Sequence, residues 1–93
     1  MNPAARAHQL RGRARHLRDL ATTIEQMPVM RLDRWCDDDT WRGPRPSLCR
    51  ATLQRNQHQL HAAADDLRLH AHRFELEAEH LDAIARSRIG LVG

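Results

Sequence analysis

Apolar and small residues recur in two segments of the chain with alternating steps of three and four, as in a helix that packs along a neighbouring helix. In the first segment, of about residues 4–36, the large apolar positions are Leu10, Leu17 and Ile24, separated by Ala7, Ala14 and Ala21. In the second, of about residues 46–88, they are Leu53, Leu60, Leu67, Phe74 and Leu81, with Ala64, Ala71, Ala78 and Ala85 among them. The pattern predicts an all-α fold with two long helices.

Prolines and glycine divide this pattern. Pro28 interrupts the first segment, and because proline lacks the amide donor and clashes with the preceding turn, we expect a kink or break there. Turn-forming residues fill 37–45 and include Trp41-Arg42-Gly43, so the chain is expected to reverse in that stretch. The 93 residues are therefore interpreted as one domain, a helical hairpin that ends in a short flexible tail at 89–93.

A reversal near residue 42 predicts which residues face each other, since the two numbers should add up to about 84 or 85. Leu10 then meets Phe74, Leu17 meets Leu67, Ile24 meets Leu60, and the alanines meet alanines. Two seven-residue repeats also match after a shift of seven, so the apolar positions alone do not select this register. The register also places Cys36 opposite Cys49, which supports it independently.

The two cysteines are interpreted as a disulfide, Cys36 to Cys49. Closing a loop of this length stabilises a small domain by about 3 kcal/mol in the chain-entropy description, and a disulfide implies an oxidising compartment. A reduced, buried pair is the alternative. A metal site is not expected, because no second cysteine pair or nearby histidine completes it.

A second apolar stripe lies on the other face of the second segment. Leu69 and Leu76 fall about 180° from the first face, and Ala62 and Ala83 continue the line. We interpret the stripe as a partner-binding surface, to which Leu20 and Met27 contribute; isolated surface leucines are the alternative. A helix this long is not covered by one short neighbour, so pairing into a four-helix bundle dimer is expected.

Charge and composition exclude several classes of function. The net charge is +3 and the basic excess lies in the first segment, a weak footprint for nucleic-acid binding. No stretch is apolar enough to span a bilayer, and no signal-peptide order is found. His58 with His61 and Glu77 with His80 have one-face spacing, but neither pair is completed, so no metal and no cofactor are expected. No nucleophile, phosphate-loop or acid-pair motif indicates an enzyme.

Trp41-Arg42-Gly43 at the turn between two amphipathic helices resembles the WXG family of small helical-hairpin proteins, and the Thr40-to-Pro44 tip with flanking cysteines looks like its actinobacterial branch. The resemblance implies a non-catalytic substrate of type VII secretion, or its companion or chaperone. Such a protein pairs with a second WXG-like chain or with the helical N-terminal domain of a toxin. It also implies a role for Trp41 in a composite recognition feature with a tyrosine-based export signal on the partner.

The chain departs from the family in having no tyrosine, and residues 84–93 carry no substitute for the export signal. The expectation is therefore a companion that is secreted, or carried to the cell envelope, beside a signal-bearing partner, or a chaperone that stays in the cytoplasm. Two readings outside secretion remain open: a cytoplasmic structural or regulatory hairpin, and a basic nucleic-acid-binding helical protein.

Overall fold

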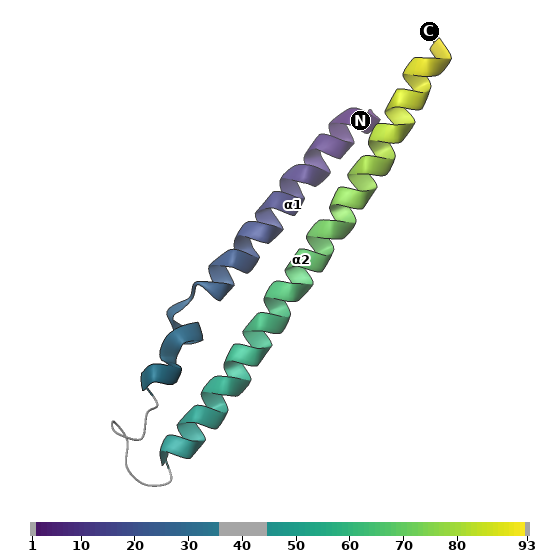
Figure 1. Cartoon of the computed structure of the whole chain (residues 1–93). Helices are drawn as coiled ribbons and strands as arrows, with labels where there is room; N and C mark the ends of the chain where they lie inside the picture. Colours follow the sequence, from purple (N-terminus) through teal and green to yellow (C-terminus); the bar gives the residue numbers. More distant parts are fainter. Residues whose placement is uncertain (1, 36–44, 93) are drawn as a thin grey trace.

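The computed structural model describes residues 2–35 and 45–92, with side chains placed at 2–31 and 47–88. The order of elements is α1 (Pro3–Glu25), the 3-10 helix η1 (Pro28–Trp35) and α2 (Arg45–Val92). Figure 1 shows α1 lying alongside α2, with η1 continuing beside the first turns of α2. The molecule is a rod of 76 × 16 × 15 Å. These elements are all helical, which confirms the predicted all-α hairpin.

Local residues explain where α1 starts and stops. The Asn2 side chain caps the helix by accepting a hydrogen bond from the amide of Ala5 (2.7 Å), and Pro3 occupies the first turn, where its missing amide costs nothing. At the other end, Pro28 cannot donate to the carbonyl of Ile24, which instead accepts from Met27 (3.1 Å). The α-helix therefore ends at Glu25, and the predicted break at Pro28 is present.

The structure corrects the predicted helix over residues 4–36. After Pro28 the chain forms the 3-10 helix η1 rather than resuming an α-helix. The side chain of Gln57 on α2 donates to the carbonyl of Val29 (3.0 Å), which ties η1 to the long helix. A 3-10 segment is a common connector at a helix end, although this one, with 8 residues, is longer than most.

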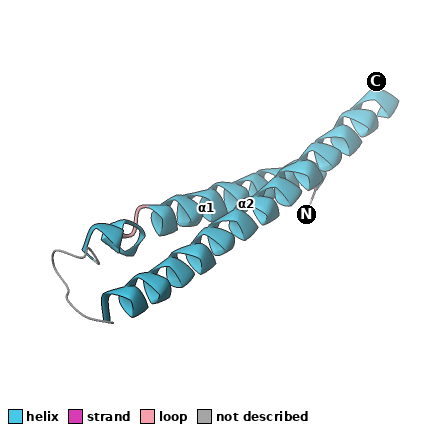
Figure 2. Ribbon diagram, turned by 60° about the horizontal axis from the view of Figure 1, so that its bottom comes forward, coloured by secondary structure: helices cyan, strands magenta, loops and turns pink. Residues whose placement is uncertain are grey.

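The structure also corrects the end of the second helix. Helix α2 begins at Arg45 and runs to Val92, so most of the predicted tail at 89–93 is helical backbone. No proline follows Pro46, and Gly90 alone costs only about 1 kcal/mol relative to alanine, which does not end a helix. With 48 residues, α2 is about twice as long as α1 and continues past its start (Figure 2).

Small and large residues alternate along the contact between α1 and α2. In heptad letters, the alanine column is a and the large apolar column, three residues later, is d. Alanines of column a are buried on both helices: Ala7, Ala14, Ala21, Ala64, Ala71 and Ala78. In column d, Leu10 is buried, while Phe74 and Leu81 pack against a cluster of Ala7, Leu10 and Ala78. This packing agrees with the register in which Leu10 faces Phe74.

Candidate partner-binding surface

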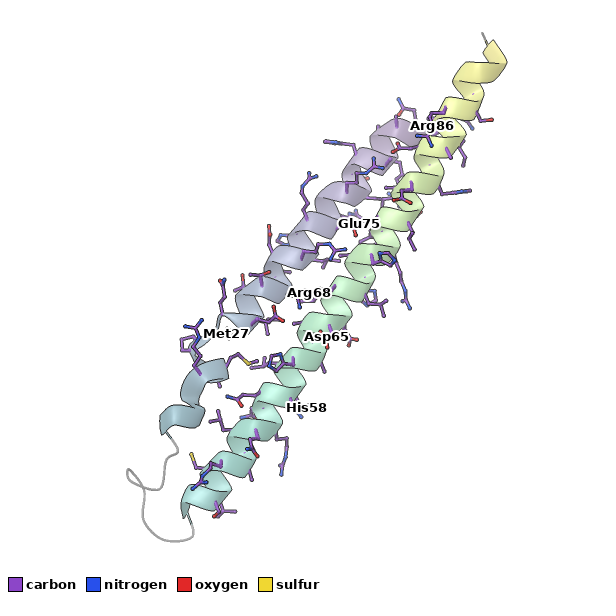
Figure 3. All side chains as sticks on the ribbon, in the orientation of Figure 1. Met27, His58, Asp65, Arg68, Glu75 and Arg86 are labelled. Carbon is purple, nitrogen blue, oxygen red and sulfur yellow. The ribbon has the colours of Figure 1, made fainter. Side chains whose placement is uncertain are left out.

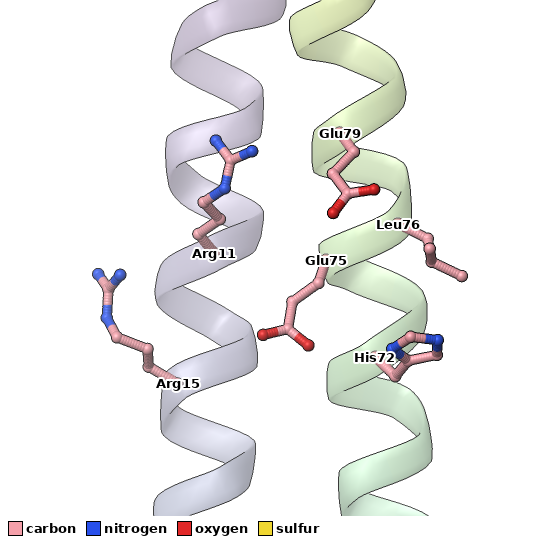
Figure 4. A pocket seen from close by; sticks show the side chains of 6 residues that line it. All are labelled: Arg11, Arg15, His72, Glu75, Leu76 and Glu79. Carbon is pink, nitrogen blue, oxygen red and sulfur yellow. The ribbon is translucent and has the colours of Figure 1, made fainter.

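One edge of the hairpin carries a row of ion pairs between α1 and α2, here called the salt-bridge ladder. Its members occupy heptad position e on both helices and lie seven residues apart: Arg11 with Asp82, Arg18 with Glu75, and Glu25 with Arg68. Position e follows each buried alanine by four residues. It therefore lies beside the seam, which is the contact between α1 and α2 made by columns a and d. Figure 3 shows Glu75 and Arg68 along this edge, and in Figure 4 the carboxylate of Glu75 extends toward α1.

The ladder is made of charge-assisted hydrogen bonds at partly exposed sites. Arg68 binds Glu25 through both terminal nitrogens, with Nη1 donating to Oε2 at 2.9 Å, so this pair is bidentate. The hydrogen bond from Arg68 lowers the pKa of Glu25, and the pKa of Arg68 is raised in return. The hydrogen bond from Arg18 likewise lowers the pKa of Glu75. The carboxylates are therefore held in their charged form at neutral pH.

The order of charges in the ladder selects one register of the hairpin. Along α1 the row reads Arg11, Arg18, Glu25, and the facing row on α2 is acidic, acidic and basic. If α2 moved by seven residues, leucines would still face leucines, but Arg18 would face Arg68 in one direction and Glu25 would face Glu75 in the other. The sign change at the third pair thus disfavours the shifted registers that the apolar repeat alone permits.

The opposite edge of the hairpin is apolar toward the tip. Leu20, at heptad position g of α1, and Met27, just after the end of α1, are both 40% exposed, and Ala63 occupies position g on α2 and is exposed. Beside them the large residues of column d are only half-buried: Leu17, Ile24, Leu60 and Leu67. We call these seven residues the apolar edge. The three ion pairs of the ladder all lie on the other side of the seam. Among the described side chains, no such row of ion pairs covers the apolar edge.

A second exposed apolar surface, the back stripe, lies on the side of α2 away from α1. It consists of Ala62, Leu69, Leu76 and Ala83, at heptad position f, with Leu69 47% and Leu76 51% exposed. Leu69 follows Leu67 by two residues and so lies about 200° around the helix from it. This separates the four predicted partner-binding residues into two faces: Leu20 and Met27 belong to the apolar edge, and they do not extend the stripe of Leu69 and Leu76.

A groove opens between the ladder and the back stripe. It has a volume of about 360 Å³ and is lined by Arg11 and Arg15 of α1 and by His72, Glu75, Leu76 and Glu79 of α2 (Figure 4). Its lining mixes cations, acids and one leucine, and Glu75 is already paired with Arg18. The groove therefore offers polar contacts at the margin of the stripe rather than a pocket for a small apolar ligand.

The predicted tip lies mostly outside the described residues. This holds for Cys36 and for Trp41, Arg42 and Gly43, so their predicted roles stay predictions. Cys49 is half-buried near the start of α2 and is disulfide-bonded. Its pairing with Cys36 also stays a prediction.

Among the described residues, no group of three or more histidine, cysteine, aspartate or glutamate side chains is placed to hold a metal ion. None of the described helices combines the length and the hydropathy that a membrane span requires. Comparison with family models, curated proteins and solved structures gave no match of any of the three kinds.

Proposed function

We propose that this protein is a non-catalytic adaptor that binds another helical protein along its apolar edge, as a WXG-like substrate or companion in type VII secretion. The observation that supports the binding role is the asymmetry of the hairpin. One edge is closed by the salt-bridge ladder, whereas the other leaves Leu17, Ile24, Leu60 and Leu67 half-buried beside the exposed Leu20 and Met27.

Half-buried large apolar residues on one side of a helical hairpin favour packing of a further helix against that side. The buried alanines bring α1 and α2 together, and the leucines beside them remain partly open to solvent on the apolar edge. A helix packed against α1 and α2 on this side would complete the burial of these leucines, which contributes about 25 cal/mol per Å² of apolar surface. A second hairpin supplies two such helices, which gives the four-helix bundle that we propose for the complex.

The secretion part of the proposal rests on the resemblance of the tip. In the sequence, Trp41-Arg42-Gly43 stands between the segments that form η1 and α2, and a disulfide-bonded Cys49 suits a protein that leaves the reducing cytoplasm. Because the chain has no tyrosine, its partner would carry the export signal. A WXG-like chain or the helical N-terminal domain of a toxin has the required shape, and the pair would be exported together.

The main rivals are a cytoplasmic structural or regulatory hairpin and a basic nucleic-acid binder. For the second, the helix that carries the basic excess would have to present its arginines to phosphates. Arg11 and Arg18 are instead bound to Asp82 and Glu75, which neutralises part of that charge. Binding to DNA that weakens steeply with salt would nevertheless favour that rival.

The test is co-expression with a helical protein encoded beside this one, followed by native mass spectrometry of the purified material. We expect a stable one-to-one complex. Leu20→Glu with Met27→Glu should abolish it, while Leu69→Glu with Leu76→Glu, at somewhat more exposed positions on the back of α2, should not. In the producing bacterium, Trp41→Ala should lower the amount of the complex in the medium without lowering its amount in cells. A protein that stays alone in every co-expression would overturn the adaptor proposal.

A further inference from the structure

We propose that Arg13 and Glu77 select the protein that binds the apolar edge. The helix that packs there carries an acidic residue that pairs with Arg13 and a basic residue that pairs with Glu77. This inference rests on the proposed function and deepens it, because it states the charges that the partner must present. Both residues lie on the same side of the hairpin as the apolar edge, but farther from the tip.

The large residues of column d stay incompletely buried beyond the apolar edge. Phe74 and Leu81 follow Leu67 at steps of seven and are half-buried, although both pack against the cluster that contains Leu10. The surface that a partner helix would cover therefore continues along α2, away from the tip. A partner that covered the apolar edge alone would leave Phe74 partly open to water. More complete burial needs a helix that continues as far as Leu81.

The residues at heptad position g border this surface, and their chemistry changes along the hairpin. Toward the tip they are Leu20 and Ala63, which belong to the apolar edge. One heptad before Leu20 the residue is Arg13, and two heptads after Ala63 it is Glu77, with His70 between them on α2. Arg13 and Glu77 are exposed. The border of the surface is thus apolar near the tip and charged farther from it.

These two charges lie beside the large residues that a partner would cover. Residues three and four apart are neighbours on a helix, so Glu77 lies next to Phe74 and Leu81, and Arg13 lies next to Leu17. A helix packed over these apolar side chains would also displace water from Arg13 and Glu77. Displacing water from an unpaired charge is unfavourable, whereas an opposite charge on the partner offsets the loss. A partner with apolar or like-charged residues at these places is therefore rejected.

Within the described residues, neither Arg13 nor Glu77 takes part in an ion pair, and Glu77 does not pair with Arg73, four residues earlier on α2. The ladder is different, because every charged side chain at position e of α1 binds an opposite charge on α2. Position g is turned somewhat farther from the neighbouring helix than position e. The ladder thus satisfies its charges inside the chain, and Arg13 and Glu77 are available to a partner.

The affinity and association rate of the complex with the co-expressed helical partner test the inference. Arg13→Glu and Glu77→Arg should each weaken the complex at least about tenfold and slow its association, and both effects should shrink in high salt. The matched controls, Arg15→Glu and Glu79→Arg, make the same changes two residues away. Arg15 and Glu79 are also exposed but line the groove on the ladder side (Figure 4), so the controls should leave the affinity unchanged.

Exchanging both charges separates pairing with a partner from pairing within this chain. If Arg13 and Glu77 bound each other in the complex, the variant with Arg13→Glu and Glu77→Arg would recover the affinity, and this result would overturn the inference. We expect the double variant to bind at least as weakly as either single variant, because each new charge meets a like charge on the partner. The melting temperatures of the isolated variants should match that of the unchanged chain, since both positions are exposed.

Selection of compensating changes identifies the charges on the partner. Partner variants that regain binding to the Arg13→Glu chain should have lost an acidic residue, and those that regain binding to the Glu77→Arg chain should have lost a basic one. Recovery only through changes of apolar residues would overturn the inference. A complex that forms and is insensitive to both reversals would also overturn it but leave the adaptor function intact, whereas the absence of any complex would overturn both.

Discussion

Arg18 of α1 binds Glu75 of α2 at the middle of the salt-bridge ladder, with an arginine-to-aspartate pair on one side and a glutamate-to-arginine pair on the other. Replacing Arg18 by glutamate would put two acids side by side at the centre of the row. We expect Arg18→Glu to lower the melting temperature by roughly 2 to 5 °C, and the exchange variant with Glu75→Arg to recover most of the loss. Circular dichroism melts at low and high salt would check both, since a contribution from ion pairs should shrink in salt. Equal loss in the single and exchanged variants would contradict the ladder.

Leu10 is the large core residue with the least exposure, at 1%. Leu10→Ala should destabilise the protein by about 2 to 5 kcal/mol, because it removes buried methyl groups and leaves a cavity beside Ala78 and Phe74. Leu20→Ala, at a position 40% exposed, should change the free energy of unfolding by less than about 1 kcal/mol. Urea denaturation of the two variants would give the comparison directly.

At the buried alanines, a larger side chain rather than a smaller one should destabilise the protein. Ala71 is fully buried against α1, so Ala71→Leu has no space to fill and should force the helices apart, at a cost of about 1 to 3 kcal/mol. Ala63→Leu makes the same change at an exposed position and serves as the control. If Ala71→Leu were as stable as the control, the close approach of α1 and α2 at that layer would be wrong.

The ladder also predicts how stability depends on pH. The pKa values of Glu25 and Glu75 are lowered in the folded protein from an ordinary value of 4.5, by hydrogen bonds from Arg68 and Arg18. A carboxyl whose pKa is lower when folded stabilises the protein above its unfolded pKa, and this contribution disappears as the pH falls through the folded pKa. The melting temperature should therefore be level near neutral pH and fall below about pH 4.5. The variant with Glu25→Gln and Glu75→Gln should start lower at pH 7 and fall less steeply.

Gln57 holds η1 by its hydrogen bond to the carbonyl of Val29. Gln57→Ala should loosen η1 while leaving α1 and α2 nearly intact, because alanine suits the position that Gln57 takes in the alanine column. Hydrogen exchange followed by mass spectrometry should show faster exchange in residues 28–35 and little change in residues 7–21. Gln59→Ala, on the exposed side of α2, is the control. Unchanged exchange in η1 would show that other contacts hold it.

The seam was predictable because hydrophobic burial follows a simple period. Leu10, Ala71 and Phe74 lie in the contact between the helices, where steps of three and four along the sequence place them. Pro28 ends the first helix because its ring leaves no amide hydrogen to donate, which the sequence alone shows. The ends of the elements were less predictable. Whether the chain after Pro28 becomes α or 3-10 depends on contacts such as that of Gln57 with Val29, which join residues far apart in the sequence.

The ladder was not predicted from the sequence, although its signal is present there. Arg11, Arg18 and Glu25 recur at seven residues, four positions after buried alanines, and the complementary charges recur on α2. Comparing the flanking charges of the two helices would have selected the register without the cysteines. The grouping of Leu20 with Leu69 failed for a different reason: each was identified as exposed, but which face each occupies depends on how α1 and α2 are placed together.

The sign change at Glu25 and Arg68 also has a kinetic meaning. A hairpin held by repeating leucines and alanines alone would have several compact arrangements of similar energy. Each shifted arrangement would be a kinetic trap, because the helices must separate before they can dock again in the native register. The reversed third pair raises the energy of those traps while the helices are still docking. We therefore expect refolding of the intact hairpin to follow a single exponential, and slow phases to appear when Glu25 and Arg68 are both neutralised.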